Sequence, residues 1–332
     1  MLAPCSPRID GPLRDLVDSS QFREAVSLFL EWSETAPEVT PRSRLLAAQA
    51  ASRIGEFELA GALATQAQAE FQVLDDKDCL LDCTNVLGAV AFERGSIDQA
   101  EAQFQSVMAL AERIGCARFI ARAANNLASV AHLRGQREHA TALYQRALDA
   151  CRTLDDQRGI IEISYNLAQS LRESGRLKAA LEDCTRAVDA AEQVGAGGLR
   201  ALTRLGRAEM LIESGAFDLA SSDIEQAQQL AWLEGNEPHT LESERLKALL
   251  ALRCGHWGHA YRQAELIRTR ASHSGCALIA AESAAIAALA LKADRRPTEA
   301  AAANDVAIAS LVALGANGRL ENHARAWRNT AA

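Results

Sequence analysis

The chain has little proline, few aromatic residues and no long hydrophobic run. Four of its seven prolines precede residue 40, so the rest of the chain almost lacks the residue that breaks helices. Aromatic residues make up only 5 % of a chain that is 48 % hydrophobic, so Ala and Leu supply most of the apolar surface. Both are strong helix formers, and small side chains let helices approach closely. These features predict an all-α protein.

Other absences exclude several classes of function. No run of about 18 apolar residues is present, so no membrane span is predicted. The formal net charge of −8 disfavours a nucleic-acid surface, which needs clustered Lys and Arg. Residues 262–270 are locally basic, but without interleaved aromatic residues they are typical of a solvated helix face. The N-terminus lacks a basic segment followed by an apolar one, so no secretory signal is predicted and a cytoplasmic location is expected.

Linear motifs of catalysis and of metal binding are also missing. The sequence contains no phosphate-binding loop, nucleophile elbow, zinc-protease motif or dinucleotide fingerprint. Cys79 and Cys83 are one helical turn apart, and Cys254, His256 and His259 cluster at one turn, but neither set supplies the four ligands that zinc requires. We therefore expect no metal and no cofactor. Catalysis is disfavoured but left open, because scattered residues can form a site without a linear motif.

What the sequence does contain is a repeat of 40 residues. Its turn position holds a glycine in six units and Arg295 in the seventh: Gly55, Gly95, Gly135, Gly175, Gly215 and Gly255. Five residues after each turn position comes an alanine: Ala60, Ala100, Ala140, Ala180, Ala220, Ala260 and Ala300. Seven residues before it comes another small residue: Ala48, Gly88, Ala128, Ala168, Ala208, Ala248 and Ala288. At these fourteen positions we expect two helices to cross too closely for a larger side chain.

Residues 122–150 show how one unit is built. Apolar residues recur at helical spacing on both sides of Gly135, which predicts two amphipathic helices joined by a tight turn. The glycine is expected to take the left-handed conformation that ends the first helix. The pairs Asp75-Asp76 and Asp155-Asp156 are expected to supply capping carboxylates before the next unit. Residues 195–198 are rich in glycine and are interpreted as a loop between the fourth and fifth units.

The pattern L-A-x-x-A-x-x-x-G at 127–135, followed by Ala140, Tyr144 and Ala147, resembles the tetratricopeptide repeat. The period of 40, rather than 34, is similar to the subclass in kinesin light chain, the Leu-Gly-Asn polarity adaptor, and bacterial Rap and MalT-type regulators. The resemblance covers about residues 40–310. It implies a right-handed α-solenoid of about seven repeats, whose concave groove binds a peptide or protein segment. The chain departs from the family where large aromatic residues are usual, for instance at Ala64 and Cys184.

Three parts of the chain are predicted. Residues 1–40 form an N-terminal extension and a capping helix hairpin around Ser19-Ser20, residues 41–315 form the repeat array, and residues 316–332 form a C-terminal capping helix. Caps are expected because each repeat buries its apolar faces only against its neighbours.

Candidate binding residues follow from the resemblance. The string NNLA at 125–128 also occurs in kinesin light chain, where helix asparagines that face the groove bind the backbone of an extended peptide. Asn suits this role because its amide offers both a donor and an acceptor. It is unfavourable inside a helix and needs a reason to be there, although satisfying polar groups within the array is an equally good reason. The predicted groove residues are Asn85, Arg122, Asn125, Asn126, His132, Glu162, Tyr165, Asn166, Gln169 and Arg172.

Three functions fit these observations. The first is a non-enzymatic scaffold or adaptor that binds a peptide or protein segment in the groove. The second is a regulatory sensor that changes shape on binding a peptide and acts through a partner or through self-association. The third is a catalytic or substrate-presenting protein, which a deep, closed pocket would favour over an open groove. Homo-oligomerisation stays open, and no nucleic acid or membrane is expected as a partner.

Overall fold

The computed structural model describes residues 9–35, 39–195 and 197–330, and all regular structure within these ranges is helical. Two helices come first: α1 (Asp10–Asp18) and α2 (Phe22–Thr35). Seven units of two helices, A and B, follow. The A helices are α3 (Pro41–Ile54), α5 (Lys77–Glu93), α7 (Ala117–Leu133), α9 (Gln157–Glu173), α11 (Gly197–Ser214), α13 (Glu237–Arg253) and α15 (Ala277–Ala293). The B helices are α4 (Phe57–Leu74), α6 (Ile97–Ile114), α8 (Arg137–Thr153), α10 (Leu177–Val194), α12 (Phe217–Glu234), α14 (Trp257–His273) and α16 (Pro297–Ala313). The last helix is α17 (Asn317–Asn329).

The predicted all-α solenoid is confirmed, and so are its close helix crossings. All thirteen alanines at the fourteen small positions are at most 2 % exposed, and Gly88 is buried as well. A Cβ atom on Gly88 would lie 2.5 Å from Cε1 of Phe104 on the facing B helix. Even a methyl group is therefore too large at that crossing.

The turn between helices A and B is also as predicted. The six turn glycines have φ between +76° and +88°, and Arg295 takes the same left-handed conformation at +58°. A second left-handed series, which the sequence interpretation missed, ends the B helices. Its members are Asp75, Gly115, Asp155, Gly195, Gly235, Gly275 and Gly315.

Two expectations at these junctions are corrected. Only the second aspartate of each pair caps a helix: Oδ1 of Asp76 accepts from the Cys79 amide at 3.0 Å, and Oδ1 of Asp156 from the Gly159 amide at 3.0 Å. The first aspartate instead belongs to the left-handed series that closes the preceding helix. In addition, α11 begins at Gly197, so the glycines at 197 and 198 are helical rather than part of a loop.

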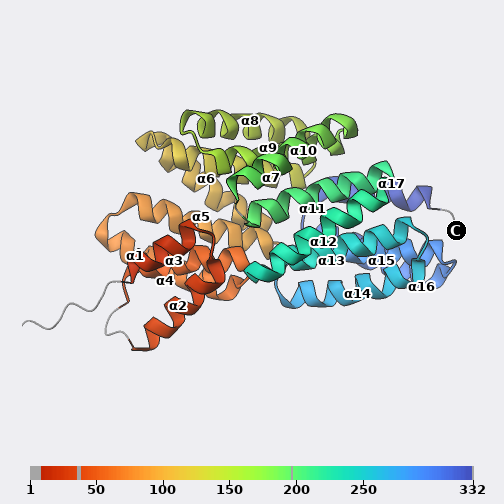
Figure 1. The fold of residues 1–332 in the computed structure, drawn as a ribbon, viewed down its shortest axis with the longest axis horizontal. Coiled ribbons are helices and arrows are strands. Elements are labelled where there is room, and N and C mark those ends of the chain that lie inside the picture. The colour runs from red at the N-terminus through yellow and green to blue at the C-terminus, as the bar shows by residue number, and fades with distance from the viewer. Residues whose placement is uncertain (1–8, 36–38, 196, 331–332) are drawn as a thin grey trace, which may run out of the picture.

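The A helices line the inside of the array, because each contacts the next A helix as well as its own B helix. The array then winds back against itself. A Cβ on the turn glycine Gly55 would lie 2.6 Å from Cδ of Pro238, and a Cβ on Gly135 would lie 3.3 Å from the amide nitrogen of Gly318. One continuous core joins α3, α4 and α5 to α13, α14 and α15. In Figure 1 these helices, orange and blue, lie side by side although nearly 200 residues separate them.

The end helices take part in this winding. α17 contacts α15 and α16, its neighbours in sequence, and also α7 from the third unit. At the other end, α1 and α2 meet at a turn in which Ser20 has a φ of +63°, and the Thr40 hydroxyl donates to the Asp10 carboxylate at 2.8 Å. The division at residues 40 and 315 stays a prediction. No described helix is long and apolar enough to span a membrane.

The helix crossings predict opposite effects for two Gly→Ala substitutions. Gly88→Ala places a methyl group against the buried Phe104 ring and should lower the free energy of unfolding by about 1–3 kcal/mol. Gly61→Ala, inside α4, meets only Cγ1 of Val90 at an ordinary 3.8 Å and should raise it by about 0.5–1 kcal/mol. Urea unfolding of both variants measures the difference. Equal effects of one sign would show that intrinsic helix propensity, not the crossing, governs these positions.

Candidate functional site

A ladder of asparagine side chains crosses the inner surface of the first units. Nδ2 of Asn126 on α7 donates to Oδ1 of Asn85 on α5 at 2.8 Å. Nδ2 of Asn166 on α9 donates to Oδ1 of Asn125 on α7 at 3.0 Å. Both bonds join residues 41 apart, so each links one unit to the next. The amide oxygens of Asn126 and Asn166 accept no hydrogen bond from a described residue.

Charged residues flank this asparagine ladder. Nη1 of Arg122 lies 2.7 Å from Oδ1 of the buried Asp82, and Nδ2 of Asn125 lies 3.5 Å from Oε1 of Glu162. Six of the ten predicted groove residues thus take part in three groups of polar contacts between neighbouring A helices, on α5, α7 and α9, which together we call the asparagine strip. These six are Asn85, Arg122, Asn125, Asn126, Glu162 and Asn166.

Tyr165 and Gln169 have a different place. The Tyr165 ring packs over Gly206 of α11, where a Cβ would overlap it, and its hydroxyl accepts from Nε2 of Gln169 at 3.2 Å. Gln169 is only 8 % exposed. Both side chains therefore hold α9 against α11 in the structure.

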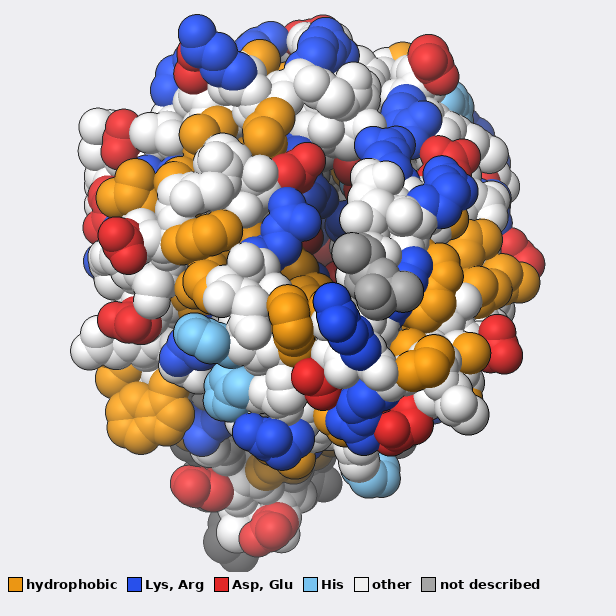
Figure 2. Space-filling model, turned by 90° about the vertical axis from the view of Figure 1, so that its right-hand side faces the viewer, with side chains coloured by type: hydrophobic (Ala, Val, Ile, Leu, Met, Phe, Trp, Pro, Cys, Tyr) orange, Lys and Arg blue, Asp and Glu red, His pale blue; other side chains and the backbone are white. Residues whose placement is uncertain are grey.

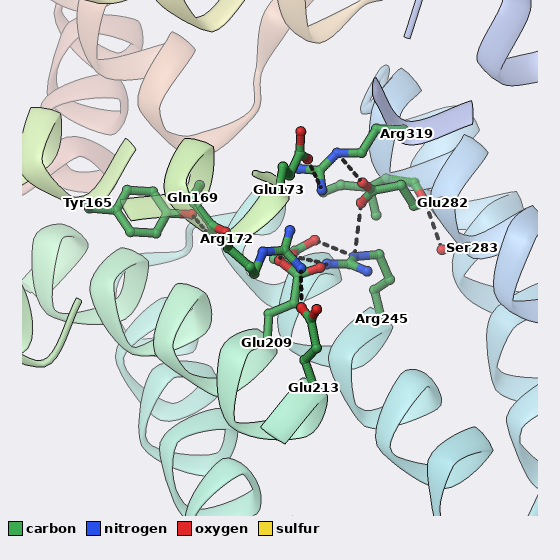
Figure 3. Close-up of polar contacts among 12 residues, drawn as sticks. Tyr165, Gln169, Arg172, Glu173, Glu209, Glu213, Arg245, Glu282, Ser283 and Arg319 are labelled. Atoms are coloured by element: carbon green, nitrogen blue, oxygen red, sulfur yellow. Dashed lines mark hydrogen bonds and ion pairs between the residues drawn. The ribbon is translucent and has the colours of Figure 1, made fainter. Parts of the chain in front are cut away.

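Further along the array the inner surface carries a closed ring of alternating charges, which we call the charge ring. Figure 3 shows its six members converging from α9, α11, α13, α15 and α17. Arg172 contacts Glu209 at 3.2 Å, and Glu209 contacts Arg245 at 3.3 Å. Arg245 contacts Glu282 at 3.3 Å, and Glu282 contacts Arg319 at 3.0 Å. Arg319 contacts Glu173 at 3.1 Å, and Glu173 is the chain neighbour of Arg172, which closes the ring. His132 of α7 adds a contact of 3.4 Å between its Nε2 and Oε1 of Glu173. Arg172 and His132, both predicted from the sequence, belong to this network.

The charge ring lines a cavity of about 440 Å³. All six ring members contribute to its wall, and apolar side chains form another part of it. These apolar residues include Ile212, Leu249, Ile286 and Leu289. Arg253, Arg325, Asn322 and Asn329 also line it. The inner surface is therefore an asparagine strip in the first half and a half-open cavity with a mixed polar and apolar wall in the second.

The ring favours binding over proton transfer. Burial alone would raise the pKa of Glu173, but His132, Arg319 and Arg172 outweigh burial and lower it to about 2. Burial opposes ionisation of Glu209 too, yet Arg172, Arg245 and Arg319 lower its pKa to about 2. Carboxylates held ionised in this way are poor general acids or bases near neutral pH.

Other inner carboxyls differ: burial raises the pKa of Glu282 in the charge ring, and it also raises that of Glu93 at the end of α5. Burial, reinforced by the charge of Glu242, raises the pKa of Glu93 to about 7. Glu93 does not line the cavity described above.

Most of the charge ring escaped the sequence interpretation, although a signal was present. Arg172, Glu209, Arg245, Glu282 and Arg319 follow one another at intervals of 36 or 37 residues, with alternating sign. This interval is shorter than the repeat of 40 by three or four residues, which is about one helical turn. Each residue therefore contacts a residue that lies one turn nearer the start of the next A helix than its own repeat position. Asn125 and Glu162 show the same interval of 37. A search for opposite charges at this offset would have found the ring.

The cysteine and histidine clusters weighed as metal sites lie apart from this surface. Cys79 and Cys83 are buried in α5, and burial raises the pKa of Cys83 to about 12, so its thiol stays protonated. Cys254 is exposed. In the described part of the chain no group of three or more His, Cys, Asp or Glu residues could hold a metal ion.

Two family models that both describe the tetratricopeptide repeat match the sequence, over residues 80–114 and 119–193. These two segments of the chain match the tetratricopeptide repeat. The matched segments include the whole asparagine strip, and the same small-residue positions extend the pattern to the unmatched units. No curated protein matches the sequence.

Solved structures with the same fold include bacterial regulators. A Rap protein complexed with competence and sporulation factor has a TM-score of 0.63 at 14 % identity, covering 97 % of this chain and 95 % of that one. The Rap conjugation gene regulator of plasmid pLS20, in complex with the Phr* peptide, has a TM-score of 0.61 at 16 % identity, covering 79 % and 74 %. NprR in complex with its cognate peptide NprX has a TM-score of 0.59 at 14 % identity, covering 96 % and 97 %. At these identities the likeness establishes the fold.

The charge ring predicts an acid-sensitive contribution from Glu173. Its folded-state pKa of about 2 lies below the ordinary 4.5, so its stabilisation is present above pH 4.5 and is lost as the pH falls toward 2. Glu173→Gln should therefore lower the free energy of unfolding by about 3 kcal/mol at pH 7, because it leaves Arg319 partly unpaired in the interior. The deficit should shrink below pH 4.5. Denaturant unfolding from pH 3 to pH 8 measures both effects.

Glu213→Gln is the matched control. Glu213 also contacts Arg172, at 3.4 Å, but its side chain is 45 % exposed, so its removal should cost at most about 1 kcal/mol. A deficit for Glu173→Gln that does not change with pH would contradict the assigned pKa.

Proposed function

We propose that the chain binds a peptide or an extended protein segment along the inner surface of its A helices and catalyses no reaction on it. The observation that carries this proposal is the asparagine ladder. Asn126 and Asn166 use an amide hydrogen in bonds to the previous unit, which fixes their orientation, and keep their amide oxygens free of intramolecular bonds. Such oxygens can accept from the backbone N–H groups of an extended segment. The tetratricopeptide repeats and the peptide complexes of the Rap and NprR structures support the same reading.

Other predicted groove residues would set specificity. Arg122, which contacts Asp82, and Glu162, which contacts Asn125, carry opposite charges, which suits a segment that carries both signs. The cytoplasmic location expected from the sequence stays a prediction, and homo-oligomerisation stays open.

Removing the two asparagine side chains tests the proposal. Asn126→Ala combined with Asn166→Ala should weaken binding of the partner by about tenfold or more, because several hydrogen bonds to the segment are lost together. Helix content by circular dichroism should not change. Peptides and proteins captured from the native lysate, identified by mass spectrometry and then titrated as purified ligands, provide the measurement.

The control for this experiment uses the same chemistry outside the groove. Gln105→Ala with Gln145→Ala removes two exposed amide side chains from the B helices α6 and α8 and should leave binding unchanged. Wild-type affinity in the double asparagine variant would overturn the proposed groove.

The winding of the array favours a sensor, which changes shape when it binds a ligand, over a scaffold that keeps its shape. The contacts of Gly55 with Pro238 and of Gly135 with Gly318 hold distant units together, so a segment of several residues along the strip must fit within this closed arrangement. A ligand that prefers a wider superhelix would shift the population toward it.

Small-angle X-ray scattering separates the two forms. With a captured ligand at saturation, a sensor should change its radius of gyration, because the superhelical pitch changes when the contacts between distant units open or tighten. The double asparagine variant with the same ligand serves as the unliganded control. Superimposable profiles with and without a saturating ligand would identify a rigid scaffold.

A further inference from the structure

The cavity in the second half of the array has a wall whose charges are already balanced. Glu209, Arg245, Glu282 and Arg319 each contact two ring members of opposite charge, and Arg172 and Glu173 each contact one. This part of the wall therefore offers a ligand no excess charge. What a ligand would meet is set by the other groups that line the same cavity.

Two of these groups are unpaired cations. Arg253 is the last residue of α13, and Arg325 lies on α17; both line the cavity and both are exposed. Neither forms an ion pair with a residue that the structure describes, whereas every arginine of the charge ring is paired. Figure 2 shows the face at this end of the molecule, which is hollowed, with Lys and Arg side chains gathered around the hollow. This arrangement favours a ligand with a negative charge that stays near the mouth.

Apolar side chains form a second recognition surface. Ile212 on α11, Leu249 on α13, and Ile286 and Leu289 on α15 line the cavity. They lie on three successive A helices; Ile212 and Ile286 are at most 4 % exposed, so the partly exposed Leu249 and Leu289 offer most of this apolar surface. A ligand with an aliphatic or aromatic side chain would bury apolar surface against these residues, which favours binding.

Two buried nitrogens in the cavity wall, Nε of Arg172 and Nδ1 of His323, have neither a hydrogen bond nor an ion pair with a described residue. His323 is 5 % exposed, and its Nε2 lies 2.8 Å from Oδ1 of Asn304; since an oxygen accepts there, Nε2 carries the proton and Nδ1 is an acceptor. Burial lowers the pKa of His323, which favours this neutral form. Neither Nδ1 of His323 nor Nε of Arg172 bonds to any described residue.

We propose that this cavity receives the C-terminal end of a short peptide, with the terminal carboxylate on Arg253 and Arg325 and the last side chain, an apolar one, against Leu249, Ile286 and Leu289. The terminal carboxylate and the last side chain diverge from one Cα, so a single residue can reach both surfaces. A cavity of about 440 Å³ is of a size that admits the end of a peptide and not a folded domain. This inference rests on the proposed function and adds to it the direction and the chemistry of the ligand.

Two synthetic libraries test the proposal. Both contain N-acetylated hexapeptides of random sequence; one has a free C-terminal carboxylate and the other a C-terminal amide. Each is equilibrated with the full chain, and the retained peptides are separated with the protein and sequenced by mass spectrometry. The free-acid library should yield retained peptides with Leu, Ile, Val, Met or Phe at the last position, and the amidated library should yield at least about tenfold less, since a hydrogen bond to a charged group is lost.

Point variants then locate the site. Titration calorimetry with the best retained peptide should show about 10- to 100-fold weaker binding to Arg253→Gln with Arg325→Gln. Arg262→Gln with Arg328→Gln is the matched control, because both residues are exposed and neither lines the cavity. All four side chains lie at the surface, and circular dichroism confirms that each variant is folded.

The outcomes are distinct. Equal retention of acid and amide peptides, or wild-type affinity in the Arg253 and Arg325 variant, overturns this inference and leaves the proposed function standing. Retention of amidated peptides that carry Asp or Glu near the end would assign the carboxylate to a side chain and would also contradict terminal recognition. Retention of no peptide from either library overturns the inference alone, because the proposed function includes longer protein segments and is tested by the asparagine variants.

Discussion

Every unit of this array depends on helix crossings at which nothing larger than a methyl group fits, and at one of them, Gly88, not even that. The thirteen buried alanines and Gly88 fix the distance between the two helices of a unit. That distance in turn fixes how far each A helix lies from the next. Only with this spacing can Asn126 reach Asn85, or Arg245 reach Glu209, across the inner surface. The contacts across the inner surface are thus a consequence of small residues that take no part in them.

The charge ring is better understood as a determinant of geometry than as a source of stability. Removing six charges from water is costly, and apolar residues of similar volume would often stabilise a fold equally well. A ring that closes on the neighbouring residues Arg172 and Glu173 instead fixes the register of five helices at once. It also gives the cavity a polar wall whose hydrogen-bonding directions are set before any ligand arrives.

The sequence was sufficient for the fold and for part of the surface. A period of 40 with fixed small residues determines the helix pairs, and helical spacing places Asn125 and Asn126 on the inner face. The contact between Arg319 and Glu173 could not be predicted in this way, because it depends on the superhelical pitch. That pitch is the sum of small rotations at every helix crossing. Aspartate 75 was misassigned for a local reason: Asp serves both as a helix cap and in a left-handed turn, and composition does not separate the two uses.

The contacts between distant units change how such an array should fold. An open solenoid is close to one-dimensional: its stability is a sum of units and nearest-neighbour interfaces, and its ends can fray independently. Here Gly55 packs on Pro238 and Gly135 on Gly318, about 180 residues further along the chain. Closing such long loops slows folding, but it makes the first and last units mutually dependent. The chain therefore has the cooperativity of a globular protein although it is built from a linear repeat.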